Sequence, residues 1–315
     1  MPEGPEVALT CHFLRDHLKG EKLGKLEVIS GRYTHQDLNG RELMTDRLYL
    51  VEDVQFKGKF LWFTLNDGGG GRVYMLNTLG MSGAWGFLPD RNARIGFDVQ
   101  GNDNGDDFVE RLYFADQRNF GTITITTDLG VLEGKLRRLG VDLLQTTMKT
   151  YELERHIAAL AARRDSRADK PIKAVLMEQE GSKGIGCGIG NYLSSEILYE
   201  ARISPHRTLS SLAGPEIGSL AGSIKRIMKL AYQCNHTGYM ERFGPYVDQH
   251  ASGITTGRYP EYHPDVDLKG ERFRFKVYDQ KTDPNGFTVI RERIGNDRTV
   301  HWVREVQTDR STKNC

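Results

Sequence analysis

The spacing of apolar residues changes midway along the chain, and this change constrains the fold more than any other feature. Before residue 150, several short segments alternate apolar and polar residues, which is the period of a half-buried strand. These segments are Leu26–Ser30, Tyr49–Val54, Phe60–Leu65, Arg72–Leu76, Arg111–Phe114 and Thr122–Thr126. From Tyr151 onward the period becomes helical. The helical segments are Tyr151–Arg163, Ile172–Gln179, Tyr192–Ala201 and Pro215–Gln233. The sequence therefore predicts an α+β protein with an N-terminal β-sandwich and a helical second domain.

Both ends of the chain depart from this simple division. Val7, Leu14 and Leu18 share one helical face behind Pro5, so a helix should open the chain. Alternation returns near the end, in Phe273–Tyr278, Phe287–Arg293 and Thr299–Val306, and turn residues separate these segments. We expect domains at 1–148, 149–269 and 270–307, the last a β-hairpin, followed by a polar tail at 308–315.

Composition excludes some classes of protein and leaves others open. The 315 residues are 38% hydrophobic, which is enough for two domains, and no apolar run reaches the roughly 20 residues of a membrane span. The net charge is only +1, so composition alone does not indicate nucleic acid. The four cysteines form no C-x-x-C pair, which favours thiols in a reducing compartment over a zinc site. We expect a soluble, unexported chain.

The first six residues, Met1-Pro2-Glu3-Gly4-Pro5-Glu6, can support chemistry. Removal of Met1 would leave a secondary amine on Pro2. An N-terminal amine has a reference pKa of about 8, against about 10.4 for lysine, so it is a nucleophile at physiological pH. Attack on an aldehyde-like carbon would give an iminium, with Glu3 and Glu6 available as acid, base or orienting group. The same residues also suit an ordinary helix start, with acids near the positive end of the dipole.

Five motifs in the same order resemble those of the formamidopyrimidine-DNA glycosylase and endonuclease VIII family. They are Met1–Glu6, Lys57–Leu61, Leu79–Gly83, Asp116–Gly121, and Gly188–Leu193 with Ser195–Leu198, the last resembling a helix-two-turn-helix. The resemblance implies a bifunctional DNA glycosylase and abasic-site lyase of base excision repair. Such an enzyme removes oxidised bases through a Schiff base on its N-terminal proline and then cleaves the strand by β,δ-elimination.

The resemblance also assigns roles to individual residues. Pro2 would attack the sugar C1′, Glu3 would donate a proton toward the sugar ring, and Glu6 would position the amine. Lys59, Asn191 and Arg298 would hold phosphates. Met81, Arg118 and Phe120 would fill the gap left by the flipped base, since emptying a stack costs a few kcal/mol unless something refills it. Each DNA-contact residue has a plainer alternative: a solvated lysine or arginine, a core methionine, a core aromatic or, for Asn191, a flexible capped turn.

The glycines before Asn191 indicate how a phosphate could bind. Gly181, Gly184, Gly186, Gly188 and Gly190 precede the predicted helix. We expect Asn191 to cap this helix and its exposed N–H groups to face a DNA phosphate.

The C-terminal hairpin departs from much of the family. Bacterial members carry four zinc-binding cysteines, and the matching positions here are Asn285, Thr288, Val303 and Val306. None can supply a thiolate, so the chain resembles the zincless-finger endonuclease VIII-like subgroup, especially members from large DNA viruses, and we expect no metal and no cofactor. That subgroup implies oxidised pyrimidines and hydantoins as substrates. Thr78, where bacterial members often have histidine, leaves one phosphate contact in doubt.

The expected partner is damaged DNA, as a duplex, bound by a monomer with no membrane association. Two other classes stay open: a DNA-binding protein with an inactive catalytic site, and an N-terminal-proline enzyme acting on small carbonyl compounds. The intact set of Pro2, Glu3, Glu6 and Lys59 argues against the first. The second leaves Met81 and Arg118 unexplained.

Overall fold

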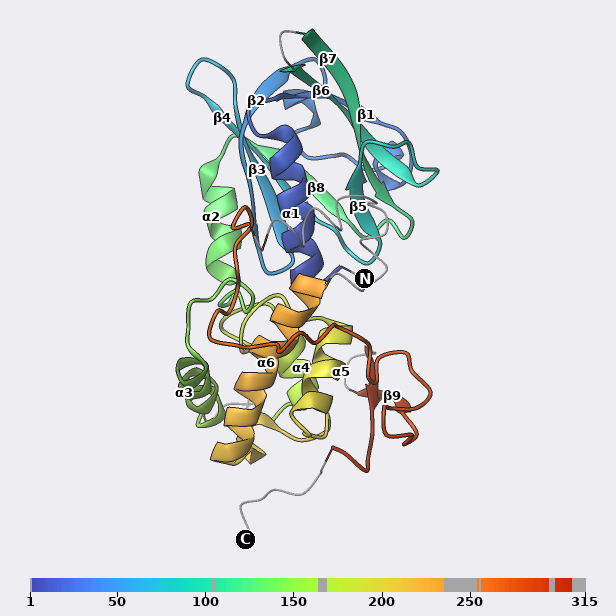
Figure 1. The fold of residues 1–315 in the computed structure, drawn as a ribbon. Coiled ribbons are helices and arrows are strands. Elements are labelled where there is room, and N and C mark those ends of the chain that lie inside the picture. The colour runs from blue at the N-terminus through green and yellow to red at the C-terminus, as the bar shows by residue number, and fades with distance from the viewer. Residues whose placement is uncertain are drawn as a thin grey trace. The chain divides into compact units, whose positions relative to one another are not determined.

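The computed structural model describes residues 2–103, 106–163, 169–234, 254, 256–294 and 298–307. They form two units, which are described separately below. Unit 1 contains Pro2 and residues 6–137, and unit 2 contains residues 3–5, 138–234 and the described residues from 254 onward. The α+β class, with an N-terminal helix, a β-sandwich, a helical domain and a small β-hairpin, is confirmed (Figure 1).

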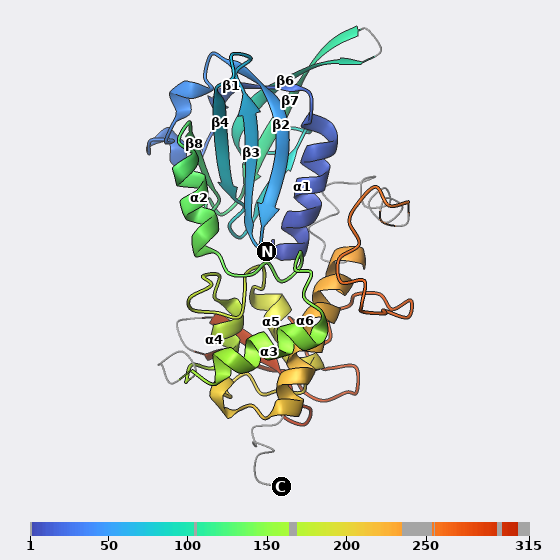
Figure 2. The same cartoon turned by 90° about the vertical axis from the view of Figure 1, so that its left-hand side faces the viewer.

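Helix α1 (Gly4–Leu18) opens the chain and buries the predicted face of Val7, Leu14 and Leu18. Its Cys11 thiol and Arg15 guanidinium donate hydrogen bonds to the Val54 carbonyl, which places α1 along strand β2 (Figure 2). An eight-stranded antiparallel sheet follows in the order β5-β7-β6-β1-β2-β3-β4-β8. Its strands are β1 (Lys22–Val28), β2 (Leu48–Lys57), β3 (Phe60–Asn66), β4 (Arg72–Thr78), β5 (Gly83–Gly86), β6 (Ala93–Asp103), β7 (Asp106–Asp116) and β8 (Thr122–Thr126).

The core of unit 1 shows that this sheet folds into two layers. Trp85 on β5 contacts Phe63 on β3, with ring centroids 5.5 Å apart, although β5 and β3 are not neighbours in the sheet. Trp85 also contacts Phe97 and Phe114, and all four side chains are buried. The aromatic cluster therefore fills the space between the layers of the sandwich.

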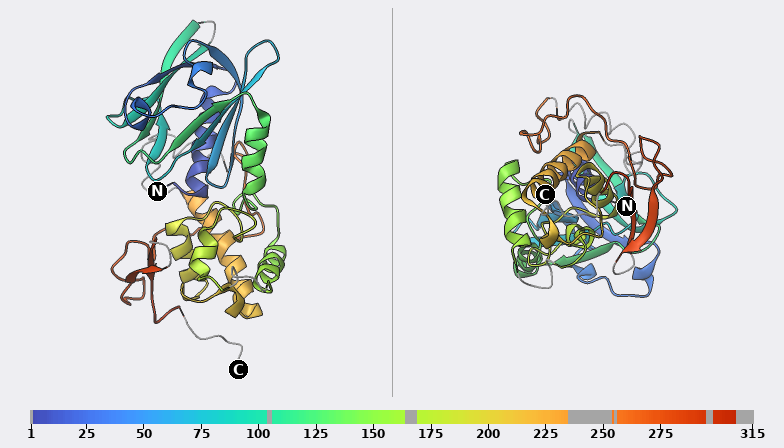
Figure 3. Two further views of the ribbon diagram at one scale, coloured as in Figure 1. Left: turned by 180° about the vertical axis from the view of Figure 1, so that it is seen from behind. Right: turned by 90° about the horizontal axis from the view of Figure 1, so that it is seen from below.

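The predicted helices of the second half lie close to their expected ranges. They are α3 (Thr150–Ala161), α4 (Ile172–Met177), α5 (Asn191–Glu200) and α6 (Gly214–Cys234). Helix α2 (Leu129–Arg138) precedes them and was not predicted from the sequence. Figure 3 shows α6 from two further sides. Two buried lysines on α6 tie the later chain to this helix: Lys225 Nζ lies 2.6 Å from the Asp265 carboxylate and Lys229 Nζ lies 2.9 Å from Glu261.

The chain ends in the predicted hairpin, formed by β9 (Ile290–Ile294) and β10 (Arg298–Trp302), with Ile290 opposite Trp302. The strand expected at Phe273–Tyr278 is wrong. The N–H groups of residues 276, 277 and 278 donate to the carboxylate of Glu196, so no neighbouring strand takes them. The alternating rings pack against Tyr192 instead. The turn expected at 295–297 and the tail at 308–315 lie outside the described residues.

Within the described part of the chain, no helix combines the length and apolar character needed to cross a membrane. Cys11 and Cys187 are buried thiols, as expected.

Candidate active site

The N-terminal residues are fixed in place by the loop that precedes α5. Pro2 is buried, and the chain enters α1 two residues later. The Gly4 N–H donates to the Gly188 carbonyl at 2.8 Å. A Cβ on Gly4 would lie 3.2 Å from the Gly188 Cα, so the two backbones are in close contact. This contact fixes Glu3, the residue between Pro2 and Gly4.

The Glu3 carboxylate occupies the N-terminus of α5. The side chain is fully buried and accepts hydrogen bonds from the N–H groups of Gly190 at 2.6 Å, Tyr192 at 2.9 Å and Leu193 at 3.3 Å. Three donors at the positive end of a helix stabilise an ionised carboxylate. The expectation that these N–H groups face a DNA phosphate is therefore wrong, because an acidic side chain of the protein already binds them.

Asn191 is not the cap of α5, contrary to the sequence prediction, because the cap position is Gly190 and the side chain that binds the N-terminal N–H groups is that of Glu3. The Asn191 Oδ1 accepts a hydrogen bond from Lys173 Nζ at 2.8 Å, and the Tyr278 side chain is a further partner of Asn191. Burial is the main cause that raises the pKa of Tyr278. Asn191 is thus held by two side chains and is half-buried.

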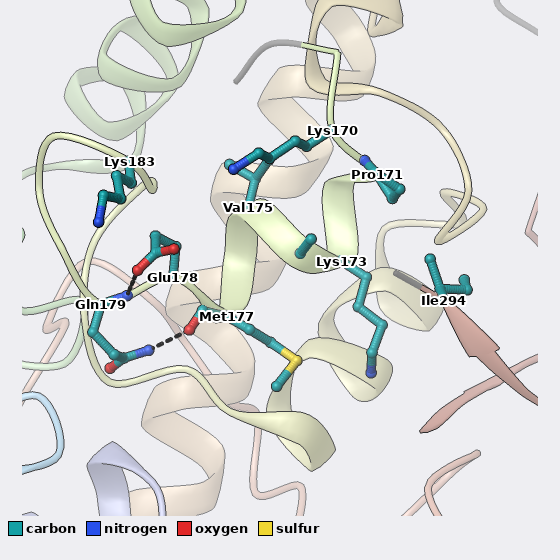
Figure 4. Close-up of a pocket in the computed structure, with 10 residues that line it drawn as sticks. Lys170, Pro171, Lys173, Val175, Met177, Glu178, Gln179, Lys183 and Ile294 are labelled. Carbon is teal, nitrogen blue, oxygen red and sulfur yellow. Dashed lines mark hydrogen bonds between the residues drawn. The ribbon is translucent and has the colours of Figure 1, made fainter. Parts of the chain in front are cut away.

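Lys173 was missed by the sequence analysis. It is buried, although it carries a charge, and it lines a cavity of about 490 Å³ together with Lys170, Met177, Gln179, Lys183 and Ile294 (Figure 4). The available signal was its place as the only charged residue among the apolar residues of α4. A buried ammonium requires acceptors, and those that Lys173 uses are Asn191 Oδ1 and, at 3.4 Å, Ser194 Oγ.

Glu6 and Lys59 belong to unit 1. Glu6 is buried in the first turn of α1, where its carbonyl accepts a hydrogen bond from Thr10 Oγ1 at 2.8 Å. Lys59 lies in the turn between β2 and β3, next to Gly58 with φ +58°, and is half-buried. Lys57 and Phe60 pair across this turn, so the turn contains only Gly58 and Lys59.

Two loops of unit 1 present the residues predicted to fill the gap in the DNA. Met81 lies in the loop between β4 and β5 and is half-buried, so it is not a core residue. Arg118 and Phe120 lie in the loop between β7 and β8, where Arg118 is exposed and Phe120 is 58% exposed. The Arg118 guanidinium lies 3.7 Å from the Met81 sulfur. The structure thus brings Met81 and Arg118 together.

Three of the positions aligned with zinc-binding cysteines, Asn285, Val303 and Val306, make other contacts in the described structure. Val303 is buried with Val277, Val289 and Tyr199 in a small apolar cluster, against which Val306 packs. The Asn285 amide donates to the Tyr199 hydroxyl and to Asp283. Among the residues that the structure describes, no three His, Cys, Asp or Glu side chains gather as a metal site would require. Among the described residues, the positions aligned with the zinc-binding cysteines therefore make apolar contacts and hydrogen bonds instead.

Arg298 is the first residue of β10, and its side chain lies outside the described part of the structure. Nothing in the geometry therefore bears on its predicted phosphate contact. Thr78, at the position noted for its missing histidine, is half-buried, and its hydroxyl lies 2.7 Å from that of Thr122.

Comparison with known proteins places these features in one family. The formamidopyrimidine-DNA glycosylase N-terminal, H2TH and C-terminal domain models match residues 1–123, 140–242 and 264–308 in order. The formamidopyrimidine-DNA glycosylase of a Nocardioides species is 27% identical over 240 residues, covering 73% of this chain and 74% of that protein. That of Thermus thermophilus is 29% identical over 241 residues, covering 74% and 76%.

Solved structures show the same fold. The MutM (Fpg) protein of Thermus thermophilus superimposes with a TM-score of 0.66 at 25% identity and covers 97% of this chain and 98% of its own. The Lactococcus lactis enzyme bound non-covalently to DNA with an AP site gives 0.65 at 18% identity and covers 97% and 99%.

Proposed function

The chain belongs to the formamidopyrimidine-DNA glycosylase family, and we propose that it is a bifunctional DNA glycosylase and abasic-site lyase acting on oxidised bases in damaged duplex DNA. The observation that carries this proposal is the Glu3 carboxylate, fixed on the N-terminus of α5 directly after Pro2. An acidic group is thereby fixed one residue from the amine that would become the nucleophile.

The proposed reaction begins once Met1 has been removed. The Pro2 nitrogen bonds to the sugar C1′ as the C1′–base bond breaks, and the base leaves with the bonding electrons. The nitrogen then loses its proton and the sugar ring opens, which gives the iminium that constitutes the Schiff base. Loss of a C2′ proton to solvent then sends the C–H electrons toward the iminium and expels the 3′ phosphate by β-elimination. Loss of the C4′ proton expels the 5′ phosphate by δ-elimination. Water finally releases Pro2.

Glu3 would carry the proton in this sequence. Three N–H donors favour its ionised form, so the carboxylate must first accept a proton before it can donate one toward the sugar ring oxygen. The amine proton that Pro2 loses is the nearest source. Glu6, buried in the first turn of α1, would orient the amine.

The remaining residues would hold the DNA. Met81, Arg118 and Phe120 would fill the gap left by the extruded nucleotide, and their exposure in two adjacent loops supports this role. Lys59, Asn191 and Arg298 would hold phosphates. Residues 1–148 would then form the catalytic domain, 149–269 the helix-two-turn-helix DNA-binding domain and 270–307 the finger.

We further place the chain in the zincless-finger, endonuclease VIII-like subgroup. The support is the finger itself, where Asn285, Thr288, Val303 and Val306 replace the thiolates and two of them pack in the apolar cluster. Oxidised pyrimidines and hydantoins would then be better substrates than 8-oxoguanine. End-labelled duplexes that each carry one of these lesions test the order of preference.

Borohydride trapping tests the mechanism. Reduction of the Schiff base during the reaction should cross-link protein to damaged DNA, and peptide mapping should place the bond on Pro2. Pro2→Gly keeps a primary N-terminal amine and should retain part of the activity, whereas an extension left before Pro2 should abolish trapping. An adduct on Lys59, or trapping that is insensitive to the extension, would overturn the proposed nucleophile.

A further inference from the structure

One buried carboxylate joins the two loops that present Met81 and Arg118. Asp116 is 1% exposed at the end of β7. Its Oδ1 accepts hydrogen bonds from the Ser82 hydroxyl and from the Arg118 N–H, the latter at 3.2 Å, and its Oδ2 accepts one from the Gly121 N–H at 2.6 Å. The Ser82 Oγ in turn accepts a hydrogen bond from the Arg118 N–H at 2.9 Å. The donors come from both loops, so Asp116 ties residues 79–83 to residues 116–121.

The backbones of the two loops also touch. Gly80 has φ +63°, and a Cβ added there would lie 2.6 Å from the Phe120 carbonyl carbon and from the Gly121 nitrogen. Both the left-handed backbone and the lack of space therefore require glycine at position 80. The first loop is closed on itself by the Gly83 N–H, which donates to the Leu79 carbonyl at 2.8 Å.

Two arginines fasten the second loop to the rest of the sandwich. Arg94 Nε donates to the Asp116 carbonyl at 2.7 Å, and Arg32 Nη2 donates to the Gly121 carbonyl at 2.7 Å. Since Asp116 and Gly121 are the ends of the loop, Arg118 and Phe120 project from a segment with both ends fixed.

We propose that Asp116 is a positioning residue that makes the two loops one rigid unit, so that Met81 and Arg118 enter the DNA stack together. Side chains held in advance avoid the entropy cost of ordering two loops separately during base extrusion. The consequence for catalysis rests on the proposed function, whereas the coupling of the loops does not.

Asp116→Asn tests the coupling without DNA. Asparagine keeps the shape and one acceptor oxygen, but its amide places an N–H donor against one of the donors that the carboxylate now binds. Amide hydrogen exchange at Gly83 in the first loop and at Gly121 in the second should accelerate by about tenfold or more, while β3 stays protected. Asp98→Asn is the control, since Asp98 is a partly buried carboxylate of the same sandwich that pairs with Arg111 and Lys25. Acceleration confined to residues 116–121 would overturn the coupling.

The ratio of base excision to cleavage of a preformed abasic site gives a second test, because a loss of stability alone would not change this ratio. Asp116→Asn and Gly80→Ala should each lower the excision of an intact damaged base more than the cleavage of a preformed abasic site, and Asp98→Asn should leave the ratio unchanged. The double variant Met81→Ala/Asp116→Asn should lose less excision activity than the product of the two separate fold-losses, because both substitutions act on the same gap-filling side chains. Multiplicative losses would contradict the positioning role. A wild-type protein without excision activity would refute the proposed function but leave the exchange result intact.

Discussion

The Glu3 carboxylate accepts a 2.9 Å hydrogen bond from the backbone N–H of Tyr192, a residue 189 positions later in the chain. The pairing gives the N-terminus of α5 an anion from within the protein. It also fixes the direction in which the residue after Pro2 can present its acid, because a carboxylate held by three donors cannot rotate freely.

Glu3→Gln should separate stability from chemistry. Glutamine offers one acceptor and one donor to a site that contains only donors, so unit 2 should lose about 1–3 kcal/mol of unfolding free energy, measured in urea. Base excision should fall more than abasic lyase activity, because an abasic sugar can open to its aldehyde without a proton from Glu3. Glu180→Gln, at an exposed pair with Lys183, is the matched control. Equal losses in both reactions would remove Glu3 from the ring-opening step.

Met81→Ala should lower excision of an intact damaged base by more than it lowers cleavage of a preformed abasic site. An abasic site has no base to extrude, so a side chain that fills the gap, such as Met81, contributes less to the reaction there. Single-turnover rates on the two duplexes measure the difference. Leu88→Ala alters an apolar side chain that is 82% exposed in the same unit and should change neither rate. A parallel decline on both duplexes would count against a void-filling role.

The finger should need no metal. Activity should survive strong chelation, and elemental analysis should find no stoichiometric zinc. Val303→Ala should lower the free energy of unfolding by about 2 kcal/mol, because it removes methyl groups from the apolar cluster of Val303, Val277, Val289 and Tyr199. One zinc per purified chain would show that the alignment of Asn285, Thr288, Val303 and Val306 with the cysteine positions is wrong.

His263 should make stability depend on pH. Burial, followed by the charge of Lys225, lowers its pKa from 6.5 to about 4, although the Leu143 carbonyl and Asp265 oppose this shift and Lys229 adds to it. The folded state therefore binds fewer protons than the unfolded state between these values. The contribution of neutral His263 to the free energy of unfolding is complete above pH 6.5. It is lost as the pH falls toward 4, by up to about 3 kcal/mol.

Urea unfolding across this pH range measures the effect. His263→Gln can keep a donor for the Leu143 carbonyl, which the His263 Nε2 now contacts at 2.9 Å, and should flatten the dependence. His35→Gln, at an exposed histidine, should leave it unchanged. A slope that persists in His263→Gln would assign the effect to another group.

Local patterns predicted the elements whose neighbours are also local. The helical face of Val7, Leu14 and Leu18 and the finger hairpin could both be predicted from spacing and turn residues. The segment Phe273–Tyr278 could not, because its N–H groups bond to Glu196, about 80 positions earlier. Alternation shows that successive side chains point to opposite faces, but it does not identify the group that accepts hydrogen bonds from the backbone N–H groups.

The candidate site also contains residues that local motifs could identify and residues whose role depends on distant partners. Motifs singled out Glu3, Asn191 and Met81, yet the predicted capping by Asn191 and the predicted anion at the N-terminus of α5 were wrong. A glycine-rich turn before a helix predicts an anion, and only the folded chain shows that the anion is Glu3. Asp116 and Lys173 were not singled out because their importance lies in contacts with Ser82 and Asn191, which no local spacing reveals.

The valine cluster of the finger has a consequence for survival under oxidative stress. Zinc fingers built on thiolates lose their metal when oxidants convert sulfur to sulfenic acid or disulfide. Residues 270–307 contain no cysteine, and the Cys11 thiol is kept protonated by burial, which raises its pKa to about 12. Oxidants that damage DNA bases therefore meet no cysteine in residues 270–307, so this hairpin should stay folded under oxidative stress.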